Sequence, residues 1–306
     1  MRCFPLILFL SAALMCSGCL GQTSPHVRSF SKEEQSDHAR HAEAAEIYDQ
    51  AMLLMHGGEF LEPDAALELL NHALELDPTL VNAHYYRATL LVQKGRGAEG
   101  LADVDTVIKA RPDFKEAHFI RGGLMLQNSE FEQAIKDYTK VIEIDPNIAE
   151  AYARRGICYS ELNRKTEAVA DFTSALALNP AHVDAHYFRG KALEDTGNLE
   201  GALHDLTEAF VLASHNVRII EGRAQVARKL KEYDLAAADY RRAIVLSPGV
   251  ARYYSSLGDV LLASGDKANA ITAVEQALRL ARAYGDARMI AIYDEQLTIF
   301  RAWVYK

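Results

Sequence analysis

The sequence predicts an all-α solenoid, an open stack of helix pairs rather than one globular core. Proline recurs every 34 residues, and small and bulky apolar residues recur in register with it. The prolines that mark successive units are Pro78, Pro112, Pro146 and Pro180, and Pro248 lies two further steps along the chain. A fixed period of this length indicates stacked supersecondary units, each covering the apolar face of its neighbour.

The first residues have the pattern of a targeting segment. Arg2 precedes an uncharged apolar run from Phe4 to Met15, which is too short for a comfortable membrane span and is typical of a signal peptide. The run closes with Cys16-Ser17-Gly18-Cys19, whose last three residues resemble the lipobox of bacterial lipoproteins, although Cys16 stands where Leu is usual. The resemblance implies removal of residues 1–18, lipidation of Cys19 and a membrane held by that lipid anchor. An ordinary cleaved signal peptide or an uncleaved anchor is the alternative.

Residues 19–43 are expected to form a flexible linker. Glycine, glutamine, serine and proline open this stretch, and charged residues follow from Lys32. A flexible coil of this length reaches roughly 25–30 Å, which would let a tethered domain stand off a membrane. His38 and His41 lie here, and two histidines alone do not make a metal site, so we expect them to be solvated.

Alignment on the prolines divides the rest of the chain into about seven helix-turn-helix repeats and a final helix. The repeats span 44–80, 81–114, 115–148, 149–182, 183–216, 217–250 and 251–284, and residues 285–306 form the final helix. Each repeat has a small residue in its first helix and another early in its second helix, as Gly156 and Ala168 illustrate. A bulky apolar residue such as Phe172 follows four positions later. Small residues at both places allow the two helices to cross closely.

These slots, recurring in register from residue 44 to residue 284, resemble the tetratricopeptide repeat (TPR). The resemblance implies a right-handed superhelix whose first helices line a concave groove for an extended or helical peptide. Three repeats depart from the pattern. The first carries extra residues around Leu61-Glu62-Pro63, the second has three glycines from Gly95 to Gly100 where its second helix begins, and the sixth begins without proline at Ser214-His215-Asn216.

One recurrence predicts an ion-pair ladder between the paired helices. Five repeats carry arginine in one slot and aspartate sixteen residues later: Arg87 and Asp103, Arg121 and Asp137, Arg155 and Asp171, Arg189 and Asp205, and Arg223 and Asp239. The two end repeats have neither charge, with Gln50 and Leu69 in the first, and Leu257 and Ala273 in the last. No repeat has a lone charge, as expected for a shared pair, because leaving one buried charge alone costs about 3–5 kcal/mol. Duplication from a common ancestor would give the same pattern without contact.

The last residues predict a cap. Arg282 replaces the proline, so the second helix of the seventh repeat can continue to Gly285, and Asp286 starts a final helix. The apolar face of this helix consists of Met289, Ile290, Tyr293, Leu297, Phe300 and Trp303. Because an open array needs a capped end, we expect this face to be buried and the far side to be polar. A dimerisation surface is the alternative.

Nothing in the repeats predicts catalysis, a cofactor or a metal site. They contain no phosphate-binding glycine loop, no His-Glu-x-x-His and no paired cysteines, and Cys158 is expected to be a buried inert thiol. His84, His118 and His186 share one slot, but equivalent positions on successive repeats lie roughly 8–10 Å apart. Zinc ligands converge within about 2 Å of one ion, so these histidines are expected to be packing residues.

The TPR resemblance implies a groove that contains Tyr48, Met52, Tyr85, Phe119, Tyr187, Lys191, Arg218 and Arg228. The N-terminal half of this set is apolar and the C-terminal half is charged, with a cationic cluster that Lys229 and Lys231 extend. An apolar groove rimmed by charge is typical of a partner site. The Lys and Asn clamp of chaperone-binding TPR proteins is not visible in these slots.

The leading hypothesis is a non-enzymatic adaptor that binds a protein or peptide partner in this groove. It would be lipid-anchored to the bacterial envelope, at the outer membrane and facing the periplasm, since Leu20 rather than Asp follows Cys19. The net charge of −9 disfavours nucleic acid as a partner. Two alternatives remain: a structural component that self-assembles through the final helix or through groove-to-tail contacts, and a binder of lipid or another small ligand in the apolar half of the groove.

Overall fold

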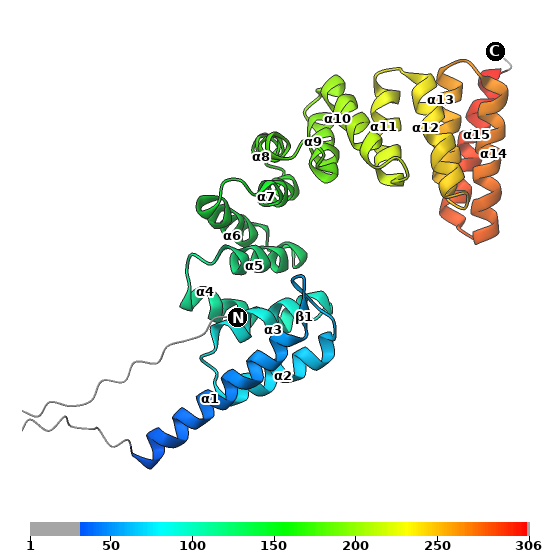
Figure 1. Ribbon diagram of the computed structural model, residues 1–306. Coiled ribbons are helices and arrows are strands. Elements are labelled where there is room, and N and C mark those ends of the chain that lie inside the picture. The colour runs from blue at the N-terminus through cyan, green and yellow to red at the C-terminus, as the bar shows by residue number, and fades with distance from the viewer. Residues whose placement is uncertain (1–30, 305–306) are drawn as a thin grey trace, which may run out of the picture.

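The computed structural model describes residues 31–304 of the chain, as fifteen α-helices and one two-stranded hairpin. The helices are α1 (Lys32–Leu53), α2 (Pro63–Leu76), α3 (Val81–Gln93), α4 (Gly97–Ala110), α5 (Lys115–Gln127), α6 (Phe131–Ile144), α7 (Ala149–Glu161), α8 (Lys165–Leu178), α9 (Val183–Asp195), α10 (Leu199–Leu212), α11 (Val217–Lys229), α12 (Tyr233–Leu246), α13 (Ala251–Ala263), α14 (Lys267–Tyr284) and α15 (Ala287–Val304). The strands β1 (Met55–His56) and β2 (Glu59–Phe60) join α1 to α2. The helix pairs follow one another along a curved path (Figure 1).

The architecture is the all-α solenoid that the sequence predicts. Each helix packs mainly against the helices that precede and follow it in the chain. Odd-numbered helices up to α13 are the first helices of the seven repeats, and even-numbered helices are the second. The buried apolar residues form a series of local clusters, from one around Leu70 near the N-terminal end to one around Tyr240 and Val274 near the C-terminal end. Within residues 31–304, no helix has the length and apolar character that a membrane span requires.

The small residues of the repeat pattern allow the close crossing of each pair. A Cβ added to Gly156 on α7 would lie 2.8 Å from the ring of the buried Phe172 on α8. A Cβ added to Gly258 on α13 would lie 2.6 Å from a methyl of Val274 and 3.2 Å from a backbone oxygen of α14. Contacts this short leave no room for a larger side chain, so glycine sets the crossing distance.

The start of the solenoid lies earlier than the sequence predicted. Ser31 caps α1 through a capping box, in which the Glu34 N–H donates to the Ser31 hydroxyl (3.2 Å) and the Ser31 N–H donates to the Glu34 carboxylate (2.7 Å). Residues 32–43 are therefore helical, which corrects this part of the predicted 19–43 linker. The Nδ1 atom of His41 lies 2.6 Å from the carboxylate of the buried Asp77, so His41 is not simply solvated as predicted. The predicted signal peptide and Cys19 lie outside the described residues.

The extra residues of the first repeat form the β1–β2 hairpin. Met55 pairs with Phe60 and His56 with Glu59 around a two-residue turn. The turn residues, Gly57 and Gly58, have φ of 60° and 91°, a conformation that glycine adopts readily. The sequence placed the insertion around Leu61-Glu62-Pro63, whereas the hairpin lies just before Leu61. Pro63 is the first residue of α2.

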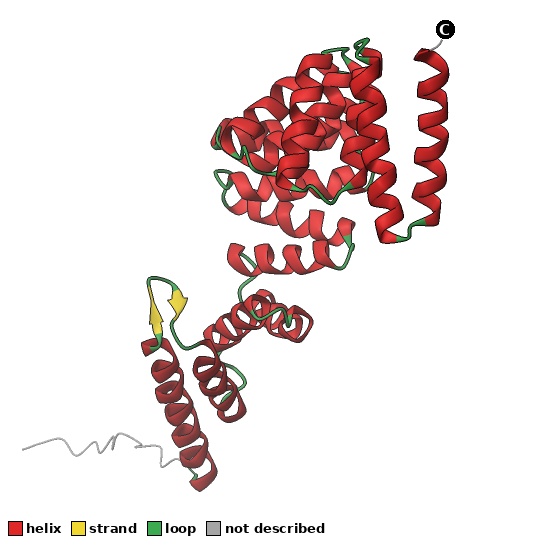
Figure 2. Cartoon of the chain, turned by 90° about the vertical axis from the view of Figure 1, so that its right-hand side faces the viewer, coloured by secondary structure: helices red, strands yellow, loops and turns green. Residues whose placement is uncertain are grey.

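The end of the solenoid follows the predicted turn but differs in its outer face. Gly285 ends α14 with φ of 69°, and the Asp286 carboxylate accepts from the Met289 N–H (3.0 Å) at the start of α15. Tyr293, Leu297 and Phe300 are buried against the seventh repeat, and α15 stands at the edge of the stack beside the marked C-terminus (Figure 2). Trp303 is 63% exposed, so the predicted buried face stops one turn earlier. The far side is not wholly polar either, because it exposes Ile292 and Ile299.

Candidate functional site

A cavity between the first helices of the second and third repeats brings two of the predicted groove residues together. Tyr85 on α3 and Phe119 on α5 line a cavity of about 320 Å³, and Val141 and Ile148 close it from the third repeat. We call this cavity the α3–α5 pocket. Its lining residues are Tyr85, Thr89, Lys115, Glu116, Phe119, Ile120, Val141 and Ile148. Most of this lining is apolar, and the charged side chains belong to the first turn of α5.

The two aromatic side chains that line the α3–α5 pocket each pack against a further aromatic ring. Tyr85 packs edge-to-face against Phe114, with ring centroids 5.0 Å apart, and Phe119 packs in the same way against Tyr138 at 5.7 Å. The Arg154 guanidinium lies 5.3 Å from the centroid of Phe119. Burial raises the pKa of Tyr85, so its hydroxyl stays protonated at neutral pH. Walls fixed in this way are ready for an apolar ligand without reordering.

The other two apolar residues predicted for the groove lie elsewhere. Tyr48 on α1 lines a separate cavity of about 270 Å³ with Arg111 and Asn82. Met52 packs against the buried cluster of the first repeat. The predicted apolar half of the groove therefore consists of separate surfaces, and the ring of Tyr86 packs against both Tyr48 and Tyr85, with centroids 6.4 and 5.1 Å apart.

The charged half of the groove is partly neutralised by nearby carboxylates. Glu194 binds both Lys191 and Lys229, the latter at 2.7 Å. Arg228 lies 3.7 Å from Asp259 in the next repeat. Arg218 is 5.1 Å from the ring centroid of Tyr187 and makes no ion pair with a described residue. Two residues of the predicted cationic cluster, Arg228 and Lys229, are thus paired with carboxylates of neighbouring repeats, while Arg218 and Lys231 make no ion pair with a described residue.

Each arginine of the predicted ladder binds the aspartate of its own repeat. Arg87–Asp103, Arg121–Asp137, Arg155–Asp171, Arg189–Asp205 and Arg223–Asp239 each form two hydrogen bonds of 2.6–2.9 Å. The five aspartates are buried. A paired fork of this kind fixes geometry as well as supplying energy. The ladder therefore sets the orientation of the two helices in each of these repeats.

Four of these arginines also bind the preceding repeat, which sequence reasoning missed. Their Nη1 atoms donate to residues sixteen positions earlier: Arg87 to Asn71 (3.1 Å), Arg121 to Asp105 (2.8 Å), Arg155 to Thr139 (3.0 Å) and Arg189 to Thr173 (3.2 Å). In the sixth repeat Arg223 instead lies 3.7 Å from the ring centroid of Phe210. The sequence signal that could have predicted this contact is the polar residue sixteen positions before each of the four arginines. The ladder thus links successive second helices.

The three histidines expected to be packing residues are members of the same ladder. The Nδ1 atoms of these histidines lie close to the ladder aspartates of the same repeats. The distances are 2.5 Å from His84 to Asp103, 2.9 Å from His118 to Asp137 and 3.2 Å from His186 to Asp205. Their Nε2 atoms contact the carbonyl oxygens of Pro78, Pro112 and Pro180, at 3.0, 2.9 and 2.9 Å. A carbonyl and an ionised carboxylate only accept, so both nitrogens of each ring face hydrogen-bond acceptors. The hydrogen bond to Asp103 raises the pKa of His84.

Cys158 on α7 carries no reactive chemistry. Its side chain is fully buried between the third and fourth repeats. Burial raises the pKa of its thiol to about 12, so the nucleophilic thiolate does not form at neutral pH. The thiol is a packing group.

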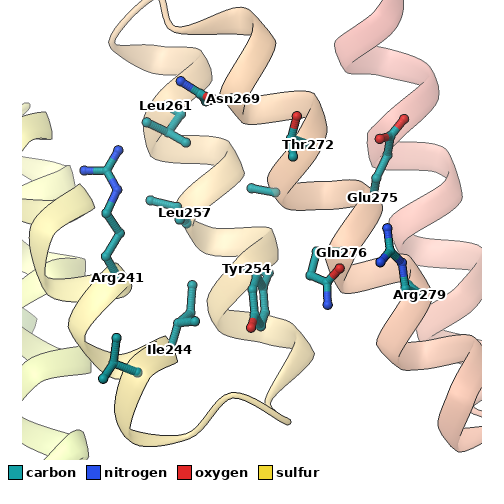
Figure 3. Close-up of a pocket in the computed structure, with 12 residues that line it drawn as sticks. Arg241, Ile244, Tyr254, Leu257, Leu261, Asn269, Thr272, Glu275, Gln276 and Arg279 are labelled. Carbon is teal, nitrogen blue, oxygen red and sulfur yellow. The ribbon is translucent and has the colours of Figure 1, made fainter.

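The seventh repeat, which lacks the ladder, has a cavity with an apolar floor beside the ladder slots. Leu257 stands where five other repeats have arginine and Ala273 where they have aspartate, and both line a space of about 580 Å³. In the third repeat, where the ladder is intact, the equivalent space of about 570 Å³ is lined mostly by charged and polar residues, so the ladder decides the polarity of this space rather than its presence. We call this space the α12–α14 groove. In Figure 3 Leu257 and Leu261 lie on α13 at its floor, with Arg241 on one side and Gln276 and Arg279 on the other. The sequence revealed the missing pair but not the groove beside it.

The fold and its surfaces define a repeat solenoid with apolar pockets. The tetratricopeptide repeat family matches residues 85–149, 153–216 and 221–289, so the chain belongs to that family. No curated protein matches the sequence.

Three solved structures illustrate the fold. MamA is 22% identical with a TM-score of 0.53, over 57% of this chain and 95% of MamA. YrrB, described as a TPR protein with an unusual peptide-binding site, is 20% identical with a TM-score of 0.57, over 63% and 98%. A TPR protein from Parabacteroides merdae ATCC 43184 is 20% identical with a TM-score of 0.54, over 87% and 99%. At these identities the likeness shows the fold alone.

Proposed function

We propose that this protein is a non-enzymatic interaction scaffold that binds a peptide segment of a partner protein along its first helices. One large apolar side chain of the partner enters the α3–α5 pocket. The observation that carries the proposal is that Tyr85 and Phe119, from different repeats, enclose one apolar cavity of about 320 Å³. Membership of the TPR family supports it, as does the likeness to YrrB, which is described as having a peptide-binding site.

The chemistry of the pocket defines the anchor that it takes. Full burial of a Leu or Phe side chain contributes about 1.5–3 kcal/mol, and the preset aromatic walls reduce the ordering cost. Thr89 and the ion pair between Lys115 and Asp145 (2.5 Å) give the rim polar groups for the peptide backbone. Glu116, which makes no ion pair among residues 31–304, would repel an acidic neighbour of the anchor. The expected partner segment therefore carries a large apolar residue without flanking carboxylates.

We also infer that a diacyl group on Cys19 tethers the scaffold to the bacterial envelope, at the outer membrane and facing the periplasm. The apolar run from Phe4 to Met15 and the Ser17-Gly18-Cys19 triplet support this inference. Two acyl chains hold a protein stably on a bilayer, and Leu20 after the cysteine favours the outer membrane.

A capture experiment tests the binding site. The mature protein is used to isolate partners from an envelope extract, beside Tyr85→Ala and Phe119→Ala variants. Tyr284→Ala is the matched control, because its aromatic ring is 72% exposed and lies outside the pocket. We expect Phe119→Ala to weaken binding of the captured partner by about tenfold or more, since it removes an aromatic side chain that lines the pocket for the partner's anchor residue. Equal capture by all three variants would show that the pocket is not the site.

A separate experiment tests the tether. In a bacterial host, the full chain and its Cys19→Ala variant are compared for incorporation of labelled palmitate and for distribution across a membrane density gradient. We expect the full chain to be labelled and to sediment with outer membranes, and the variant to lose the label and leave the membrane fraction. Labelling that persists in Cys19→Ala would contradict the inference.

A further inference from the structure

The α12–α14 groove differs from the ladder repeats at three related positions. Leu257 replaces the arginine, Ala273 replaces the aspartate, and Arg241 occupies the slot sixteen positions before Leu257. In four other repeats this slot holds the acceptor of the inter-repeat hydrogen bond, Asn71, Asp105, Thr139 or Thr173. A cation thus stands where the ladder has an acceptor. Arg241 makes no ion pair with a described residue, so its charge faces the open groove.

The groove combines an apolar floor with unpaired positive charge. Tyr254, Leu257 and Leu261 of α13 form the floor, where Leu257 and Leu261 are 8% and 5% exposed, and Val245, which is 78% exposed, extends it along α12. Glu275, the carboxylate on the wall, binds Arg301 of α15 at 2.7 Å and is already neutralised. Arg279, also on the α14 wall, makes no ion pair within residues 31–304. An apolar trough flanked by guanidinium groups suits an amphipathic helix that carries a carboxylate.

The same chain presents such a helix face on the outside of α15. Ile292, Ile299 and Trp303 are 43%, 49% and 63% exposed. Glu295 lies among them at helical spacing, is exposed, and makes no ion pair in the described part of the chain. Positions 292, 295, 299 and 303 share one face, away from the buried face that contains Leu297. We call this face the α15 stripe.

We propose that two copies of the protein associate through their C-terminal ends, with the α15 stripe of each copy lying in the α12–α14 groove of the other. Ile299 and Trp303 cover the apolar floor, and the Glu295 carboxylate pairs with Arg241. Within one chain this contact cannot form, because α15 packs on the side of α14 away from the groove (Figure 3). A second copy is the favoured occupant because the chain itself supplies both the apolar stripe and the complementary charge.

The reciprocal contact has a consequence for the scaffold. A two-fold interface is closed and uses each surface once per copy, so it produces a dimer rather than a fibre. The α3–α5 pocket lies at the opposite end of the chain and stays open in each copy. A dimer would present two peptide sites, which raises the apparent affinity for a partner that carries two anchors.

The mass of the mature full chain in solution tests the proposal, with light scattering after size exclusion at several micromolar concentrations. We expect a dimer for the native sequence. Arg241→Glu and Glu295→Arg should each weaken dimerisation by about tenfold or more, because each places like charges in contact. The combined Arg241→Glu and Glu295→Arg variant restores opposite charges across the interface, and we expect the dimer to return.

Arg242→Glu is the matched control, with the same charge change on the same helix but outside the groove lining. It should leave the dimer intact, and circular dichroism should show the same helix content in all variants. A monomeric native protein overturns the proposal, as does a dimer that neither single change affects. A dimer lost with Glu295→Arg alone, and not regained in the combined variant, overturns the assignment to the groove. The loss of partner capture in Phe119→Ala does not require a dimer, so the two proposals can fail separately.

Discussion

The fourth and seventh repeats have the same helix pair but differ in the surface where the second helix of each meets the second helix of the preceding repeat. This surface is polar in the fourth repeat and has an apolar floor in the seventh. In the fourth, Arg155 binds Asp171 and reaches back to Thr139, so a polar network spans the space. In the seventh, Leu257 and Ala273 replace the ion pair and line a groove of about 580 Å³. Closely related backbones therefore carry either a polar cross-link between repeats or a groove with an apolar floor. The choice depends on a few side chains that have changed together.

The physical reason for joint change is the cost of a lone buried charge. Asp171 is buried, and without Arg155 its carboxylate would keep the desolvation cost but lose two hydrogen bonds. Replacing both residues with apolar ones removes the charge and its cost together. The following predictions test this comparison, beginning with the largest expected effect.

Asp171→Ala should lower the free energy of unfolding by about 3–5 kcal/mol, because it leaves the largely buried Arg155 guanidinium without its carboxylate partner. The combined Arg155→Leu and Asp171→Ala change, which copies the seventh repeat, should cost clearly less than the sum of the two single changes. Urea unfolding of the four proteins measures the coupling. Strictly additive losses would show that the two side chains do not act as a pair.

His84 should make stability depend on pH near neutrality. The hydrogen bond to Asp103 raises the pKa of His84 in the folded protein. Its stabilisation is therefore fully present below the unfolded pKa of about 6.5 and is lost as pH rises through the higher folded value. Urea unfolding across this range, compared with His84→Tyr, measures the effect. Tyrosine occupies the same slot in the fourth repeat as Tyr152, and an unchanged pH profile in the variant would contradict the prediction.

The carboxylate of the same network should act at acid pH. Burial tends to raise the pKa of Asp103, but hydrogen bonds from His84 and Arg87 outweigh burial and lower it. Its contribution is therefore present above the unfolded pKa of about 3.9 and is lost as pH falls through the lower folded value. Acid unfolding of native protein and of an Asp103→Asn variant should differ in this range, and coincident curves would contradict the assignment.

Installing the ladder pair in the seventh repeat should replace the apolar floor of its groove with charge. Leu257→Arg with Ala273→Asp recreates the pair found in five other repeats, and we expect the free energy of unfolding to change by less than about 1.5 kcal/mol. The proposed dimer should be lost, because charged side chains would then occupy the apolar floor. Light scattering and urea unfolding of the same sample measure both outcomes, and a persistent dimer would contradict the comparison.

The smallest effect should come from the link between repeats. Thr139→Val removes the acceptor for the Arg155 Nη1 atom and should cost about 0.5–1.5 kcal/mol, the net value of one hydrogen bond. Thr207→Val is the matched control, because this slot receives no hydrogen bond from Arg223, which lies over Phe210 instead. Equal losses in the two variants would show that the inter-repeat bond adds nothing.

Much of the fold could be predicted from the sequence because the repeat pattern is local. The 34-residue period located the pairs, and Gly285 with Asp286 located the final turn. The start of α1 was missed because its first turns are charged on all sides and carry no apolar stripe. The double role of His84 was missed because its two acceptors, on Asp103 and Pro78, lie nineteen residues ahead and six behind.

The sequence by itself determined the family, the order of the helices and the slots that carry paired charges, since each of these repeats at a fixed interval. The tertiary structure decided which side chains enclose space. Tyr85 and Phe119 form one pocket while Tyr48 lines another, and Leu257 with Arg241 borders an open groove. Cavities and charge pairing depend on side-chain packing between neighbouring repeats, where differences of a few ångströms decide whether a surface is filled or left open.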